Sequence, residues 1–298
     1  MSESNLHVPV MLNEIIELFS TGSPEPRKLL DGTFGRGGHS SALMQRYPNL
    51  HVVGVDQDLT AIDHGQKVIE PQFPGRLTMF HGTFAKFTEQ NQDVFDLILL
   101  DLGVSSPQLD NPERGFSFYH NGPLDMRMNQ NQKMSAATMI NEWDEEDLID
   151  IFKNYGEVRS PYRVIRAILF DRQTKPFTTT HQLAGLIERI EGWQKKGKHP
   201  ATQYFLGLRL RVNQELESVQ DSLPRMIRSL VPGGVLVVMT FHSLEDRIAK
   251  NIFKDHEEFG YRINKKVIVA SDEEQKLNPR SRSAKLRGFL RRPDEKHE

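Results

Sequence analysis

The chain of 298 residues contains no cysteine. The absence of thiols excludes disulfide bonds, thiolate metal sites and a cysteine nucleophile, and it fits a reducing compartment. No apolar run approaches the roughly 18 residues of a membrane span, and residues 1–5 lack the basic and apolar segments of a signal peptide. We therefore expect a cytoplasmic protein with no membrane segment.

The sequence also lacks an excess of either charge. Its 38 Lys and Arg residues nearly balance its 40 Asp and Glu residues, which gives a net charge of −2. A partner such as nucleic acid is therefore indicated only where charges of one sign cluster. The 11 histidines are scattered and show no metal-ligand spacing, so we expect no metal site. The length allows one large domain or two modest ones.

The most informative segment is a short apolar strand that ends at Asp31 and runs into a glycine-rich turn. Gly35, Gly37 and Gly38 allow a tight turn and a close approach of the backbone to a ligand. A helix is predicted over residues 39–47, and its free N–H groups would face the turn. Ser40 stands where the dinucleotide fingerprint has its third glycine. Without further signals, a turn with no ligand would explain this segment equally well.

A second apolar strand over residues 51–56 ends in a carboxylate, and this favours a ligand-binding turn over a turn with no ligand. Asp56 lies 19 positions after Gly37, where an acidic residue accepts both hydroxyls of an unmodified ribose. Nicotinamide dinucleotides and S-adenosylmethionine both fit such a site. Asp31, an acidic residue ahead of the glycines, is more typical of the methyltransferase version.

Further apolar runs predict an α/β fold with a doubly wound, mostly parallel, seven-stranded sheet of the Rossmann-like class. The expected strands cover residues 28–34, 51–56, 77–84, 95–103, 234–243, 261–270 and 283–290. Expected helices cover residues 7–20, 39–47, 60–69 and 244–256, and one longer helix runs through 205–219. Helical patterns at 143–155, 161–170 and 180–190 indicate an inserted helical subdomain. We thus expect a methyltransferase-type domain formed by residues 1–104 and 201–298, with an insertion over 105–200 as a candidate RNA-recognition subdomain.

Three side chains at the predicted strand ends have alternative interpretations. Phe84 could lie against an adenine or belong to the core. Asp101 could meet the ammonium of a methionine group or the substrate, or it could cap a loop. His242 could contact the nucleotide, act as a base or serve as a hydrogen-bonded structural residue.

The segment from Ser105 to Gln108 indicates amine chemistry. Amino-group methyltransferases carry a short proline-containing loop at this place. Carbonyl and hydroxyl oxygens there can accept the N–H bonds of an exocyclic amine, whose lone pair then attacks an activated methyl group in line. Ser105, Ser106 and Pro107 are therefore candidate catalytic residues, with Pro107 stiffening the loop. The same residues could form a plain turn.

Basic residues cluster near the C-terminus and in the insertion. Side chains suited to phosphate contacts within residues 280–292 are Arg280, Arg282, Lys285, Arg287, Arg291 and Arg292. The insertion adds Arg159, Arg163, Arg166, Lys195, Lys196 and Lys198. Such runs are usually solvated surface, but beside a nucleoside site they favour RNA or DNA binding.

With these motifs the sequence resembles the RsmH (MraW) family, cytidine N4-methyltransferases of 16S ribosomal RNA. The resemblance rests on segments 7–12, 31–40, 101–110, 114–118, 122–128, 241–247 and 278–287. It covers nearly the whole chain. Departures from the family pattern, at Asn121, Gln203 and residues 158–162, lie outside the cofactor loops.

The resemblance implies methylation of one cytidine amine in the decoding region of 16S rRNA, within a small subunit that is at least partly assembled. It implies that S-adenosyl-L-methionine is the cofactor, bound by Gly35, Gly37, Gly38, His39, Asp56, Phe84, Asp101 and Gln108. The RNA would be held by Arg280, Arg282, Lys285, Arg287 and His242, and by the insertion. The oligomeric state is left open, with a homodimer allowed. Two alternatives remain: an NAD-dependent oxidoreductase, and a non-catalytic RNA-binding protein that keeps the cofactor pocket.

Overall fold

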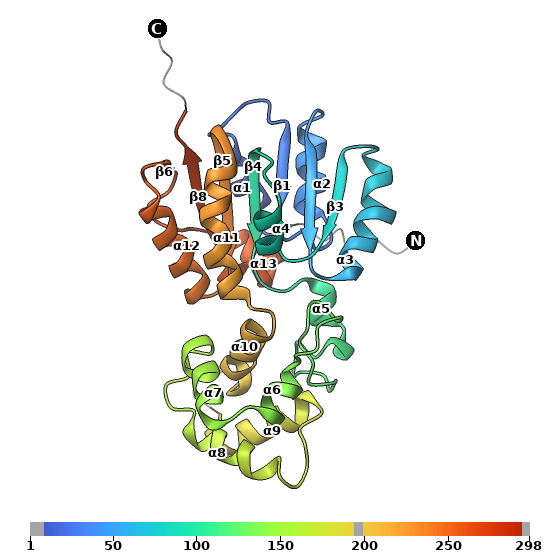
Figure 1. Ribbon diagram of the computed structural model, residues 1–298, viewed down its shortest axis with the longest axis vertical. Coiled ribbons are helices and arrows are strands. Elements are labelled where there is room, and N and C mark those ends of the chain that lie inside the picture. The colour runs from blue at the N-terminus through green and yellow to red at the C-terminus, as the bar shows by residue number, and fades with distance from the viewer. Residues whose placement is uncertain (1–8, 194–198, 294–298) are drawn as a thin grey trace. The chain divides into compact units, whose positions relative to one another are not determined.

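The computed structural model describes residues 9–193 and 199–293. The chain divides into two compact units, which we describe separately. The first comprises Met1–Gly103 and Leu216–Glu298, and the second is Val104–Glu215. Figure 1 shows the strands gathered in the first unit and the second unit built from helices.

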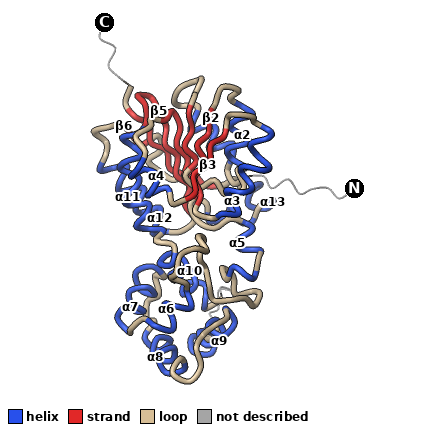
Figure 2. Tube along the Cα trace, turned by 45° about the vertical axis from the view of Figure 1, so that its right-hand side comes forward, coloured by secondary structure: helices blue, strands red, loops and turns tan. Residues whose placement is uncertain are grey.

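The first unit is organised around one eight-stranded sheet with the order β3-β2-β1-β4-β5-β8-β6, and β7 pairs with β8. The strands from β3 to β5 are parallel, and β8 runs antiparallel to β5. Figure 2 shows the strands side by side in red. The strands are β1 (Lys28–Asp31), β2 (His51–Asp56), β3 (Leu77–His81), β4 (Phe95–Asp101), β5 (Leu230–Thr240), β6 (Gly260–Arg262), β7 (Ile268–Val269) and β8 (Lys285–Arg291). This arrangement confirms the predicted doubly wound α/β fold.

The central strands are apolar throughout because helices cover both faces of the sheet. In β4, Leu97 and Leu99 belong to one core cluster, while Ile98 and Leu100 belong to the other. The first cluster packs under α1 (Leu12–Phe19) and α2 (Gly38–Arg46). The second packs under α11 (Glu215–Ser229) and α12 (Ser243–Asp255), which lie in front of the sheet in Figure 1. Burial on two faces keeps the carboxyl ends of the strands fixed.

The other helical segments of the first unit are short. They are α3 (Leu59–His64), the π-helical η1 (Gly65–Ile69), η2 (Glu70–Gln72), α4 (Phe84–Gln90), α13 (Asp272–Leu277) and η5 (Pro279–Ser283). Residues 7 and 8 of the first predicted helix lie outside the described residues, and α1 begins at Leu12. Among the described residues, no helix combines the length and apolar character needed to cross a membrane.

The edges of the sheet differ from the sequence-based expectation. The sheet has eight strands instead of seven, because the predicted strand over 261–270 is interrupted into β6 and β7. The predicted strand over 77–84 ends at His81, since the Thr83 side chain accepts a hydrogen bond from the Lys86 N–H and starts α4. Phe84 is therefore the first residue of a helix that the sequence reading missed.

The second unit is a helical assembly around its own core, which includes Leu148, Phe152, Ile165, Leu183 and Tyr204. Its elements are α5 (Ser106–Asp110), η3 (Pro112–Arg114), α6 (Ala136–Glu142), α7 (Glu145–Asp150), η4 (Ile151–Tyr155), α8 (Tyr162–Asp171), α9 (Thr180–Glu191) and α10 (Ala201–Val212). These helices form the second compact unit, Val104–Glu215, which contains the residues of the expected insertion.

The long helix predicted through 205–219 is wrong, because the chain breaks between α10 and α11. The Asn213 side-chain oxygen accepts a hydrogen bond from the Met128 N–H at 2.8 Å, and its amide donates to the Arg209 carbonyl oxygen at the end of α10. Gln214 adopts a left-handed backbone, with φ of 49°. As a result α10 belongs to the second unit, whose boundary lies at residue 215 instead of the expected residue 200.

Candidate active site

The parallel strands of the first unit place three carboxylates at one edge of the sheet. Asp31, Asp56 and Asp101 are the last residues of β1, β2 and β4. Glu245 follows β5 in the first turn of α12. Ligands of open α/β sheets bind outside the carboxyl ends of the strands, so these groups define the candidate site.

The glycine turn between β1 and α2 has the geometry that its sequence predicted. Gly35 and Gly37 have φ values of 53° and 69°, a conformation that side chains resist. The Phe34 ring also lies beneath Gly37, where an added Cβ would come within 2.5 Å of it. A side chain at position 37 is therefore disfavoured both by the backbone conformation and by the ring.

Asp56 is tied directly to this turn. One carboxylate oxygen accepts a hydrogen bond from the Gly35 N–H at 2.7 Å, and the other accepts one from the Asp58 N–H at 2.8 Å. A carboxylate offers about four acceptor positions, so each oxygen retains capacity for a hydroxyl donor. Burial raises the pKa of Asp56 to about 6. The residue fits the role of a ribose acceptor.

Ser40, the departure from the dinucleotide fingerprint, has a structural explanation. Its buried hydroxyl donates a hydrogen bond of 2.6 Å to Asp31, whose carboxyl group is also buried. The other Asp31 oxygen accepts the Thr33 N–H at 3.2 Å. Burial still raises the pKa of Asp31 to about 6. Glycine at position 40 would leave this carboxylate without its side-chain donor.

Asp101 has the most perturbed carboxyl group of the site. Burial, followed by the nearby charges of Asp31 and Glu245, raises its pKa to about 8. Its backbone N–H donates to the Thr33 hydroxyl at 2.6 Å, which joins the end of β4 to the turn after β1. A carboxyl group held in this way gains strongly from a cationic ligand.

His39 lies beside Asp101 and is almost fully buried. Its Nε2 faces the Val10 carbonyl oxygen at 2.9 Å, so that nitrogen carries the proton. Nδ1 then faces Asp101, 3.7 Å from a carboxylate oxygen. The expected contact of His39 with the cofactor stays a prediction.

His242 and Glu245 form a second acid–imidazole pair, with 2.8 Å between Nε2 and the carboxylate. Glu245 is buried, and it also accepts the Phe241 N–H at 3.0 Å. Glu245 was not among the residues predicted from the sequence. Its position in the first turn of the helix that follows a predicted strand was the signal that could have identified it. His242 is half-buried in this pair, so its expected contact with RNA stays a prediction.

Phe84 is half-buried at the start of α4 and packs against the core that contains Leu30 and Phe87. Its Cβ lies close to Gly32, in the turn after β1. This position satisfies the core interpretation, and the stacking on adenine stays a prediction.

Ser105, Ser106, Pro107 and Gln108 lie in the second unit, at the start of α5. The Gln108 side chain accepts the Ser105 N–H at 3.0 Å, which closes a capping box around the first turn. Pro107 occupies the first turn, where its missing N–H costs nothing. Gln108 is buried and its side chain bonds within the loop itself, and its contact with the cofactor stays a prediction.

The predicted RNA-binding residues near the C-terminus fall into two groups. Arg280 and Arg282 are exposed and Lys285 is half-buried. Arg287 is buried, and its guanidinium donates to both Asp246 carboxylate oxygens at 2.7 and 3.1 Å. The expected phosphate contact of Arg287 does not fit this geometry, because the buried ion pair already uses the guanidinium.

The basic residues of the insertion are only partly described. Arg159, Arg163 and Arg166 are exposed in the second unit. Lys195, Lys196 and Lys198 lie outside the described residues. The described residues contain no group of His, Cys, Asp and Glu arranged to hold a metal ion.

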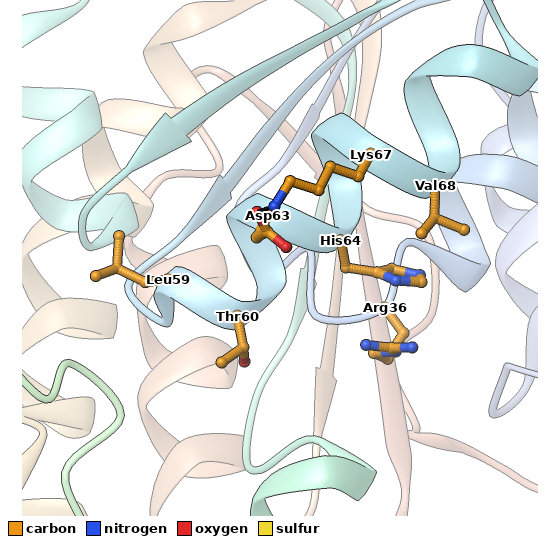
Figure 3. A pocket seen from close by; sticks show the side chains of 7 residues that line it. All are labelled: Arg36, Leu59, Thr60, Asp63, His64, Lys67 and Val68. Carbon is orange, nitrogen blue, oxygen red and sulfur yellow. Dashed lines mark ion pairs between the residues drawn. The ribbon is translucent and has the colours of Figure 1, made fainter.

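A shallow cavity of about 480 Å³ lies beside α3 and η1 (Figure 3). It is lined by Arg36, Leu59, Thr60, Asp63, His64, Lys67 and Val68. Lys67 is paired with Asp63, and burial together with Arg36 lowers the pKa of His64. We assign no ligand to this cavity.

The sheet order, the glycine turn and the carboxylates at the strand ends define a class I methyltransferase fold. The chain belongs to the MraW methylase family, whose family model matches residues 4–292.

Curated relatives that match the chain carry the name ribosomal RNA small subunit methyltransferase H. The protein from Bdellovibrio bacteriovorus is 56% identical, covering 96% of this chain and 88% of its own. The protein from Agrobacterium fabrum is 45% identical, covering 96% and 87%. Among solved structures, an rRNA methylase from Streptococcus thermophilus aligns over 98% of this chain and 99% of its own at 8% identity and a TM-score of 0.46.

The raised pKa of Asp101 makes the stability of the ligand-free protein depend on pH. The folded state holds the proton up to a pKa of about 8, whereas the ordinary value is 3.8. The contribution of Asp101 to the free energy of unfolding is therefore complete at low pH and is lost as pH rises toward 8. We expect the Asp101→Asn variant to gain stability relative to the unmodified protein between pH 4 and pH 8, with no further change above.

Urea unfolding followed by circular dichroism measures this difference. Tryptophan fluorescence would report on the second unit, because both tryptophans lie there, whereas Asp101 belongs to the first unit. Asp93→Asn is the matched control. Asp93 is an exposed carboxylate whose pKa is lowered by Lys28, so its effect has the opposite sign and is confined to acid pH. A stability difference between Asp101→Asn and the unmodified protein that stays constant from pH 4 to 8 would contradict the assignment.

Proposed function

We propose that the protein transfers the methyl group of S-adenosyl-L-methionine to the exocyclic N4 amine of a cytidine in the decoding region of 16S rRNA. The single observation that carries this proposal is the Asp56 carboxylate, hydrogen-bonded to Gly35 N–H and retaining acceptor capacity at a strand end. Membership of the MraW methylase family supports the chemistry. The names of the curated relatives support the small-subunit rRNA as substrate.

The residues present suit the cofactor. Asp56 would accept the ribose hydroxyls, and the Gly35–Gly38 turn would admit the ligand close to the backbone. Asp101 would hold the ammonium group, because a cation relieves the repulsion among the carboxylates around it. Phe84, His39 and Gln108 complete the proposed cofactor set, the first against the adenine. Bound there, the cofactor supplies an activated methyl group on a sulfonium.

The chain's own task is to orient the amine. In a cytosine, the exocyclic lone pair is delocalised into the ring, so the nitrogen is a weak nucleophile. Oxygen acceptors from Ser105, Ser106 and the adjoining carbonyls would draw the N–H bonds out of the ring plane and free that lone pair. The capping box and Pro107 hold this loop in one conformation. The proton of the methylated amine can leave to water, so no dedicated base is required.

The substrate would be met in the cytoplasm, within a small ribosomal subunit. Arg280, Arg282 and Lys285 would contact phosphates, and the helical unit would hold RNA through further residues. A homodimer is compatible with this proposal and is not needed for it.

The direct test is transfer of labelled methyl groups from S-adenosylmethionine to small subunits isolated from cells that lack the native enzyme. We expect N4-methylcytidine at a single site on nucleoside analysis. Asp101→Asn should lower the transfer rate at least about 100-fold, since the positioning charge is removed. Asp93→Asn, which changes an exposed carboxylate, should leave it unaltered.

Two results would count against the proposal. Tight cofactor binding without transfer to any RNA would favour the non-catalytic RNA-binding alternative. Transfer to a different base or atom would refute the cytidine N4 assignment while retaining the methyltransferase.

The basic C-terminal segment gives a separate prediction. Replacing Arg280, Arg282 and Lys285 together with alanine should weaken RNA binding and reduce the slope of log K against log salt by roughly 2 to 3, because each lost phosphate contact removes about 0.7 to 0.9. Cofactor affinity should not change.

Arg287→Met serves as the contrast in this experiment. It breaks the buried pair with Asp246 and should lower the free energy of unfolding by about 3 kcal/mol, with the salt slope unaltered. Equal RNA affinity of the triple variant and the unmodified protein at low salt would show that the segment is structural.

A further inference from the structure

Four aromatic rings from separate segments of the second unit form a continuous row. Tyr119 and Phe118 have ring centroids 4.9 Å apart, and Phe118 and His199 lie 4.5 Å apart. His199 in turn lies 5.1 Å from Trp193. We call these four residues the aromatic row. Phe118 and Tyr119 lie in the loop after η3, Trp193 follows α9 and His199 precedes α10, so the fold brings them together.

The two ends of the row face solvent. Tyr119 is 74% exposed and Trp193 is 61% exposed. Phe170, in α8 of the same unit, is also exposed, but no ring contact links it to another aromatic among the described residues. A single exposed aromatic needs no explanation, whereas two exposed aromatics joined by a series of ring contacts point to a ligand.

The loop that carries Phe118 and Tyr119 is held in place. The Thr180 hydroxyl donates to the His120 carbonyl oxygen at 3.3 Å and accepts the Gly122 N–H at 3.2 Å. Asn121, a departure from the family pattern, accepts the His181 N–H at 3.3 Å. These bonds attach the loop to the first turn of α9. Tyr119 is therefore presented by a fixed backbone.

The other end of the row is fixed by one carboxylate. Glu188 accepts the indole N–H of Trp193 and lies 3.9 Å from Nε2 of His199. Nδ1 of His199 accepts the Ala201 N–H at 3.1 Å, which orients the imidazole. Phe118 packs edge-on against the buried Phe205, with centroids 4.9 Å apart. The rings are thus preorganised, so a ligand that stacks on them need not order them.

The size of the exposed surface indicates what could cover it. Tyr119 and Trp193 together expose on the order of 300 Å², since a large aromatic side chain carries about 150–250 Å². A stable protein interface buries roughly 800 Å² on each partner. One or two nucleobases match the smaller area, and every base has a π face that stacks on aromatic rings. The row therefore suits unpaired nucleotides better than a protein.

We infer that the aromatic row is a stacking platform for one or two unpaired bases of the RNA on which the protein acts. The inference rests on the proposed function, because it takes the substrate to be RNA. It assigns to the second unit a contact that depends on stacking, in addition to phosphate contacts made by basic residues.

The tryptophan content of the chain allows a direct test. The sequence has two tryptophans, Trp143 and Trp193, so a Trp143→Phe variant reports on Trp193 alone. We expect a short single-stranded RNA to quench this fluorescence in a saturable manner, and a fully paired duplex of the same sequence to quench it much less. Adding Tyr119→Ala should weaken the single-strand affinity roughly 5- to 100-fold, the range for losing one base stack. Tyr119→Phe should restore it.

The matched control is Phe170→Ala, which removes an exposed aromatic outside the row and should leave the affinity unchanged. The salt slope of binding should be the same in Tyr119→Ala as in the parent, because stacking releases no counterions. Absent quenching, or equal affinities for Tyr119→Ala and Phe170→Ala, would overturn the inference. Failure of the proposed function would be seen separately, as absent methyl transfer by the unmodified protein.

Discussion

The hydrogen bond from the Gly35 N–H to Asp56 is the contact on which the candidate site depends. It joins the turn after β1 to the end of β2, and the turn adopts positive φ values at Gly35 and Gly37 that glycine permits. The Thr33 hydroxyl makes the matching connection to the end of β4 through the Asp101 N–H. Together these bonds fix three strand ends relative to one another, and the two-sided core beneath them keeps the strands in place.

This rigidity has an electrostatic cost. Asp31, Asp56 and Asp101 are held in surroundings that raise the pKa of each, and Asp31 and Glu245 both act on Asp101. Buried carboxylates that repel one another favour a protonated state or a cationic ligand. A cofactor with an ammonium group and a sulfonium relieves this repulsion. The repulsion that destabilises the ligand-free fold therefore favours binding of the cofactor. Perturbed groups of this kind are typical of functional sites.

Much of the fold could be predicted because its signals are local. Apolar strands of four to seven residues, the glycine turn and the spacing to Asp56 are all visible in the sequence. The break between α10 and α11 could not be predicted, since it depends on a hydrogen bond between Asn213 and the distant Met128. The burial of Arg287 was hidden for the same reason: its partner Asp246 lies 41 residues away. The surroundings of Asp31 and Asp101 could not be predicted either. Ser40 bonds to Asp31, and the Glu245 charge lies near Asp101, only once the chain has folded.

Proton release on binding tests most directly whether the strand-end carboxylates form the site of a cationic cofactor. Calorimetric titration with S-adenosylmethionine at pH 7, in buffers of different ionisation enthalpy, counts the protons exchanged. Asp101, whose pKa is about 8 without ligand, is largely protonated at that pH. We expect binding to release close to one proton, because the Asp101 carboxyl group loses its proton when it pairs with the cation. We expect this release to be lost in Asp101→Asn. Tight binding with no proton released, or with the same release in the variant, would contradict this expectation.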